Sequence, residues 1–221
     1  GSWNFAATAY LNRWKVKIYY EHYFDDHSQM FFQYGRWKDG HIGLEITFPK
    51  NRFIDTFVYE GLGTKDQTGP MLYDSFWGEF EEQISAKDNY YNHYLYQGWQ
   101  HWGMGIGNPL LPGPIYNKNG QITFISNRVL AHHIGFCGSP CQSLSYRMLL
   151  SYSRHWGTYD NPLNEIKKQF NSLFEVTYAP QQLKGWSFAV SGAMDRGSIL
   201  GNNYGGMLVI RKQGIIKSGN K

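Results

Sequence analysis

The stretch WKVKIYYEH, residues 14–22, alternates apolar or aromatic side chains with a second, more polar set. Because successive side chains of a β-strand point to opposite faces of a sheet, this period of two predicts a strand with one apolar face. The first face carries Trp14, Val16, Ile18 and Tyr20, and the second carries Lys15, Lys17, Tyr19 and Glu21.

The same alternation recurs along the chain, in HIGLEITF (41–48), SLSYRMLLSYS (143–153) and GWSFAVSG (185–192). Other segments are strand-like with a mixed or partial pattern: 3–11, 53–60, 124–136, 170–178 and 204–212. Together these segments predict about nine strands. We expect Ile42, Leu44, Ile46, Leu144, Met148 and Leu150 to share the apolar face of residues 14–20, and Glu45, Arg147 and Glu175 to share the face of Lys15 and Lys17.

Composition supports an all-β chain that forms a single unit over residues 1–221. Charged residues make up 17% of the sequence, aromatic residues 18%, and glycine occurs 25 times, with no change in composition that would mark a linker. The net charge of +4 comes from scattered lysines and arginines, which argues against nucleic acid as a partner. No nucleotide-binding or hydrolase motif is present, so we expect neither an enzyme nor a cofactor.

Connection lengths predict the architecture. Short turns are expected at LNRW, FPKNRF, FCGSPCQ and YAPQQLKGW, and long loops at 23–40, 61–123, 158–169 and 195–203. An antiparallel up-and-down meander with tight turns at one end and long loops at the other is typical of a transmembrane β-barrel of the bacterial outer membrane. Aromatic residues near both ends of the strands fit two interfacial girdles. Since nine strands is an odd number, we expect this chain to be the carboxyl-terminal part of a larger barrel.

Three groups of residues are candidates for function. The aromatic stretch NYYNHYLYQGWQHWGMGIG (89–107) lies in the longest loop and could either contact polysaccharide or pack as a plug in the lumen. A second set of polar residues is expected to organise the loops, and no metal site is expected. Two cysteines flank a Gly-Ser-Pro sequence and could be free or form a disulfide across a turn. The polysaccharide candidates are Tyr90, Tyr91, Tyr94, Tyr96, Trp99 and Trp102; the loop-organising candidates are Glu21, His22, Asp25, Asp26, Lys65 and Asp66; the cysteines are Cys137 and Cys141.

Four segments resemble the carboxyl-terminal half of capsule assembly proteins of the Wzi family, of the type found in Bacteroidetes outer membranes. They are YYEHYFDDHS (19–28), YEGLGTKDQTGP (59–70), NYYNHYLYQGWQHWGMGIGNPL (89–110) and NNYGGMLVIRK (202–212). The resemblance implies a barrel of about eighteen strands, of which this chain would supply the second half. It also implies a lectin-like, non-catalytic role at the cell surface, attaching or helping to assemble capsular polysaccharide.

The residues alone leave two other functions open. A porin or saccharide channel would have the same strands with the long loop narrowing its pore, and a soluble carbohydrate-binding β-domain would share the aromatic loop. Outer-membrane lipid would be a partner of the capsule-assembly barrel and of the channel, but not of the soluble domain. The sequence makes no prediction about oligomeric state.

Overall fold

The computed structural model describes residues 2–23, 39–51, 53–65, 68–72, 84–87, 89–92 and 100–214. Within these ranges the chain is all-β, apart from one short 3-10 turn, η2 (Pro114–Tyr116), and none of the described residues forms a helix that could cross a membrane. Nine strands form one antiparallel sheet, in which each strand pairs with the next in chain order. They are β1 (Ser2–Leu11), β2 (Trp14–Tyr23), β3 (Gly40–Thr47), β4 (Thr56–Gly63), β9 (Val129–Cys141), β10 (Leu144–Gly157), β11 (Pro162–Tyr178), β12 (Trp186–Gly197) and β13 (Asn203–Lys212).

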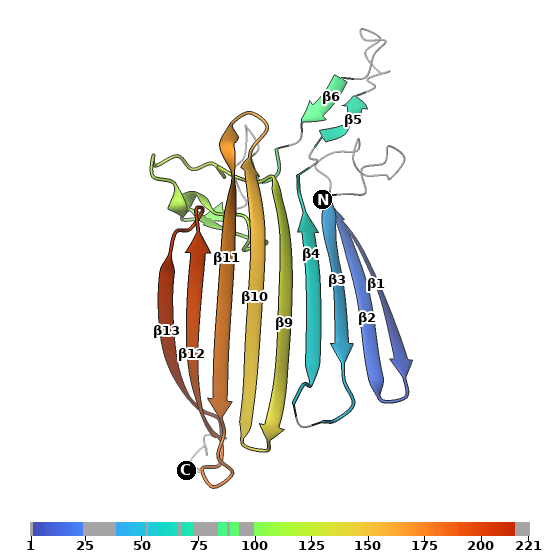
Figure 1. Cartoon of the computed structure of the whole chain (residues 1–221), viewed down its shortest axis with the longest axis vertical. Coiled ribbons are helices and arrows are strands. Elements are labelled where there is room, and N and C mark those ends of the chain that lie inside the picture. The colour runs from blue at the N-terminus through green and yellow to red at the C-terminus, as the bar shows by residue number, and fades with distance from the viewer. Residues whose placement is uncertain are drawn as a thin grey trace, which may run out of the picture.

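The predicted nine-stranded meander is therefore confirmed (Figure 1). The described part of the sheet is open, with β1 and β13 as its edge strands. Two small sheets lie in the connection between β4 and β9: β5 (Thr68–Leu72) pairs with β6 (Ile84–Lys87), and β7 (Gln100–His101) pairs with β8 (Met104–Gly105).

Connections differ at the two ends of the sheet, as Figure 1 shows. We call them the turn end and the loop end. At the turn end, Asn12 and Arg13 join β1 to β2, and Asn12 adopts a positive φ of 55°, which asparagine tolerates in tight turns. At the loop end, residues 64–128 join β4 to β9.

The predicted bounds of two long loops are wrong, because both connections are shorter in the structure. Strand β10 continues to Gly157 and β11 begins at Pro162, so residues 158–161 replace the expected loop 158–169. Likewise, β12 continues to Gly197 and leaves only 198–202 as the connection to β13. The parts of these strands nearest the loop end carry polar side chains on both faces, so hydrophobic alternation did not predict them.

The predicted position of the turn, between the two cysteines, is also wrong. Cys137 and Cys141 both belong to β9, and the turn follows at Gln142 and Ser143. Four residues along one strand separate the two Cα atoms by about 13 Å, well beyond the range a disulfide can bridge. Both cysteines are free, as this geometry requires.

The register aligns the nine strands in continuous rows of side chains, and each row lies on one face. One face is apolar through the middle of the sheet and has no Asp, Glu, Lys or Arg there; we call it the apolar face. The opposite face carries Lys15, Lys17, Glu45, Arg147 and Glu175 and is called the polar face, so the predicted separation of the two sets is confirmed. One complete row of the apolar face reads Ala9, Val16, Ile46, Phe57, Phe136, Met148, Phe174, Gly192 and Gly206.

Candidate functional site

A row of hydrogen-bonded side chains crosses the polar face near the loop end. Tyr19 donates to Glu60, the imidazole of His133 bonds Ser151 at 2.6 Å, and Asn171 donates to Asp195 at 2.6 Å. Because these pairs are side-chain neighbours along one register row, the strand pairing itself brings them together. The complete row, which we call the polar row, is Ala6, Tyr19, Gly43, Glu60, His133, Ser151, Asn171, Asp195 and Asn203.

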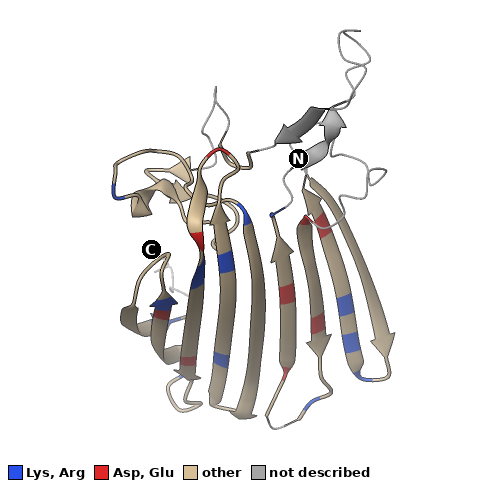
Figure 2. Ribbon diagram, turned by 45° about the horizontal axis from the view of Figure 1, so that its top comes forward, with Lys and Arg blue, Asp and Glu red and all other residues tan. Residues whose placement is uncertain are grey.

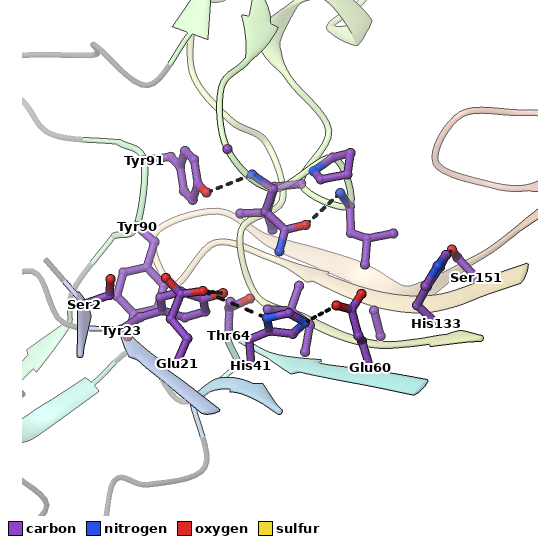
Figure 3. A pocket seen from close by; sticks show the side chains of 17 residues that line it. Ser2, Glu21, Tyr23, His41, Glu60, Thr64, Tyr90, Tyr91, His133 and Ser151 are labelled. Carbon is purple, nitrogen blue, oxygen red and sulfur yellow. Dashed lines mark hydrogen bonds and ion pairs between the residues drawn. The ribbon is translucent and has the colours of Figure 1, made fainter. Parts of the chain in front are cut away.

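His41 links the polar row to Glu21, one row closer to the loop end. Its Nε2 atom lies 3.5 Å from Glu60 Oε1, and its Nδ1 atom lies 3.9 Å from Glu21 Oε2. Figure 3 shows this imidazole between the two carboxylates. A carboxylate on each side fixes the orientation of the imidazole ring. The three side chains come from β2, β3 and β4, which lie next to one another in the sheet.

Gly43 makes room for the contact between Tyr19 and Glu60. The ring of Tyr19 lies over the Cα atom of Gly43, so a Cβ built there would be 2.0 Å from Tyr19 Cζ. A glycine inside a strand marks such a close approach. Here it lets the tyrosine reach across β3 to a carboxylate on β4.

We predict that Gly43→Ala will displace the Tyr19 ring and break its hydrogen bond to Glu60. Overpacking of this kind costs about 1–3 kcal/mol of folding free energy. Denaturant titration of the folded protein measures the loss. Gly192→Ala is the matched control, since a Cβ at that strand glycine would meet nothing within 4 Å. Equal stability of the two variants would show that the Tyr19 contact does not depend on Gly43.

The loop between β4 and β9 folds onto the polar face at the loop end. Phe124 is 2% exposed and packs in a small core with Leu111 from the loop and Leu62, Val129 and Ala131 from the strands. Asn92 fixes the same loop by a reciprocal pair of hydrogen bonds with the backbone of Phe124, both 2.8 Å long. These contacts hold the loop against the sheet.

A cavity of about 700 Å³ lies between the loop and the polar face. Figure 3 shows that side chains from the sheet and from the loop surround it. The strands contribute Glu21, Tyr23, His41, Glu60, His133 and Ser151, and the loop contributes Tyr90, Tyr91, Asn108, Leu110 and Leu111, among others. Among the described residues, none of those that line the cavity is a lysine or an arginine. This mixture of hydroxyl, carboxylate, imidazole and tyrosine groups suits a neutral polyhydroxylated ligand better than an anionic one.

The candidate aromatic residues of the loop separate into two groups. Tyr90 is 5% exposed, and Tyr91 is half-buried with its ring centroid 5.0 Å from that of Phe124, so both pack within the folded loop as well as line the cavity. Burial raises the pKa of the Tyr91 hydroxyl above its usual value, although the backbone of Asn108 partly offsets this. Trp102 is 86% exposed, whereas Tyr94, Tyr96 and Trp99 lie outside the described residues.

The loop-organising candidates also differ in where they lie and in what they contact. Glu21 bonds His41 in the cavity, and His22 is buried with its Nδ1 atom 3.4 Å from the carbonyl oxygen of Asp39. The carbonyl oxygen of Lys65 accepts hydrogen bonds from Arg128 and Tyr159. Asp25, Asp26 and Asp66 lie outside the described residues. No group of His, Cys, Asp or Glu within the described ranges is arranged to hold a metal ion.

Sequence reasoning missed most of the strand residues that line the cavity. Glu21 is one of the loop-organising candidates, but the sequence does not single out His41, Glu60, His133 or Ser151. The sequence feature that could have indicated them is a polar residue at a strand position that faces the polar side of the sheet. This signal assigns a side chain to one face of the sheet. It does not show which residues of other strands lie beside that side chain, because this depends on the register with distant strands.

Fold and site together define an antiparallel meander with one apolar face and one polar face, the latter carrying a loop-covered cavity. No protein-family model matches the chain, and no curated protein or solved structure is significantly similar to it. The chemistry of the cavity therefore has to be inferred from its own residues.

Proposed function

We propose that this chain is part of an outer-membrane β-barrel that attaches or helps to assemble capsular polysaccharide, as its resemblance to the Wzi family implies. The role is lectin-like and non-catalytic, and the complete barrel would contain about eighteen strands. The observation that carries the proposal is the apolar face, which spans all nine strands.

Exposure of the apolar face supports a position in lipid. Ile18 in β2 is 54% exposed, and Val190 and Leu208, which are paired neighbours in β12 and β13 at the other side of the sheet, are 61% and 66% exposed. Monomeric soluble proteins rarely expose contiguous apolar patches larger than a few hundred Å². A barrel in lipid places such a face outward and leaves its polar face toward the lumen.

The cavity and the adjacent loop support polysaccharide as the ligand. Flat tyrosine and tryptophan faces stack on the C–H surfaces of sugars, and Asn, His and Ser side chains supply directional hydrogen bonds. Tyr90, Tyr91 and Asn108 bring both kinds of group to the loop side of the cavity. Glu21 and Glu60 both contact the His41 imidazole, which fits a binding site rather than a pair of catalytic carboxylates.

Replacing Trp102 with alanine tests the proposal in cells. Because Trp102 is 86% exposed, its removal creates no cavity in the fold, and we predict unchanged abundance of the protein in the outer membrane with release of capsule from the cell. Capsule retention measured by polysaccharide staining, together with membrane fractionation, gives both quantities. Tyr10→Ala is the control, since Tyr10 is 75% exposed at the turn end. Retention equal to the wild type would argue against a sugar contact at Trp102.

A further inference from the structure

Three basic side chains stand together on the apolar face at the loop end. Arg154 of β10 pairs directly with Lys168 of β11, and Arg196 of β12 pairs with Phe170, two residue pairs nearer the turn end. All three are exposed, and Figure 2 shows basic segments on these neighbouring strands. We call Arg154, Lys168 and Arg196 the basic rim.

The basic rim spans two neighbouring rows of the apolar face, with Arg154 and Lys168 in one row and Arg196 in the next. Leu144, Tyr178 and Phe188 share one register row near the turn end. Ten residues separate this row from Arg154 and from Lys168, and eight separate it from Arg196 (154 − 144, 178 − 168 and 196 − 188). A tilted strand needs about 9–11 residues to cross the hydrocarbon core of a bilayer. If the apolar face meets lipid, the three cations therefore lie at the boundary between hydrocarbon and headgroups on the loop side.

No described carboxylate neutralises the basic rim. None of its three members forms a salt bridge with a described residue, and the neighbouring acid Asp195 is turned to the polar face, where it bonds Asn171. The Arg154 guanidinium lies 5.5 Å from the centroid of the Trp156 ring. The Lys65 ammonium lies 5.1 Å from the same ring and adds a fourth positive charge beside the rim.

Aromatic side chains lie directly below the rim. Tyr152 pairs with Phe170 in the register row next to Arg154 and Lys168, and Tyr152 is exposed. Aromatic rings of this kind sit at the level of lipid headgroups in membrane proteins. The apolar face thus changes, over two residue pairs, from aromatic side chains to positive charge, and Arg196 shares the row of Tyr152 and Phe170.

We propose that the basic rim binds the phosphate groups of a phosphorylated glycolipid in the outer leaflet, whose acyl chains lie along the apolar face below. Arg and Lys donate charge-assisted hydrogen bonds to phosphate oxygens, and clustered cations at the edge of a lipid-facing surface recognise anionic headgroups. The inference rests on the outer-membrane location proposed above and adds the lipid that the barrel selects.

Binding of labelled diphosphoryl lipid A to the protein in detergent micelles tests the inference. The triple variant Arg154→Gln, Lys168→Gln, Arg196→Gln is compared with a control of equal charge change at the turn end, Arg13→Gln, Lys50→Gln, Lys184→Gln, whose residues are all exposed. Each cation near an anionic lipid surface contributes about a fivefold factor, so we expect affinity roughly 100-fold weaker for the rim variant. The control should bind like the wild type.

Two further measurements on the wild type do not depend on folding of a variant. Dephosphorylated lipid A should bind as weakly as diphosphoryl lipid A binds to the rim variant, and inorganic phosphate should not compete at concentrations equal to the lipid. Equal binding of the phosphorylated and dephosphorylated lipids, or of the rim variant and the control, overturns the proposed lipid site but not the proposed outer-membrane location. A wild-type protein that stays soluble without detergent overturns the outer-membrane location, and the lipid site with it.

Discussion

Lysine in place of Leu44 or Met148 is expected to lower the free energy of folding into lipid by about 2–4 kcal/mol, the usual cost of a charge facing hydrocarbon near the middle of a bilayer. Both residues lie on the apolar face, in adjacent register rows across the centre of the sheet. Denaturant titration in lipid vesicles measures the loss. In a soluble domain either lysine could extend into water at little cost.

Ala193→Lys provides the matched control for this prediction. Ala193 is exposed and pairs with Leu173 and Gly205, so it lies on the polar face at the same height as the central rows. A lysine there would face a polar lumen and should change stability by less than 1 kcal/mol, about the scale of an ordinary surface substitution. A loss at Ala193 as large as that at Leu44 would contradict the assignment of the two faces.

Phe124→Ala is expected to release the loop from the polar face. Removing a buried phenylalanine costs about 3–5 kcal/mol. The cost should fall mainly on the loop, because Phe124 connects it to Leu62, Val129 and Ala131 at the strand ends. Limited proteolysis should then cut within residues 100–127 while the nine strands stay protected. Ile122→Ala, at an exposed position in the same loop, is the control.

Unchanged protection of the loop in the Phe124 variant would show that hydrogen bonds alone hold it. Asn92 bonds both backbone groups of Phe124, and Asn127 donates to the carbonyl oxygen of Tyr90 at 2.7 Å. These bonds do not require the phenyl ring. The result would therefore assign the anchoring of the loop to its asparagines.

The two faces of the sheet could be predicted from sequence because alternation is a local property of each strand. Trp14, Val16 and Ile18 all fall on the apolar face with Leu44 and Ile46, as their spacing indicates. The upper parts of β10 and β11 could not be predicted in this way. Residues such as Asn164, Glu165 and Lys167 are polar on both sides of the strand and lack the alternation of a half-buried one.

The composition of the cavity depends on contacts between distant parts of the chain. Glu60 of the cavity lining, for example, accepts a hydrogen bond from Tyr19 across 41 residues, and His41 lies 3.5 Å from the same carboxylate. Register at this range is set by turns and bulges, such as the irregularity between Leu144 and Tyr146 that shifts the expected cysteine turn. For the same reason, the sequence left open whether Tyr90 packs in the plug or contacts a ligand.

Spin labels placed along β2 test most directly that the apolar face meets lipid. In a background with both cysteines replaced by serine, labels at 16 and 18 should be accessible to oxygen dissolved in the bilayer, and labels at 15 and 17 to a water-soluble nickel complex. We predict this alternation with a period of two in lipid vesicles. Access of the nickel complex to labels at 16 and 18 in the reconstituted protein would contradict it.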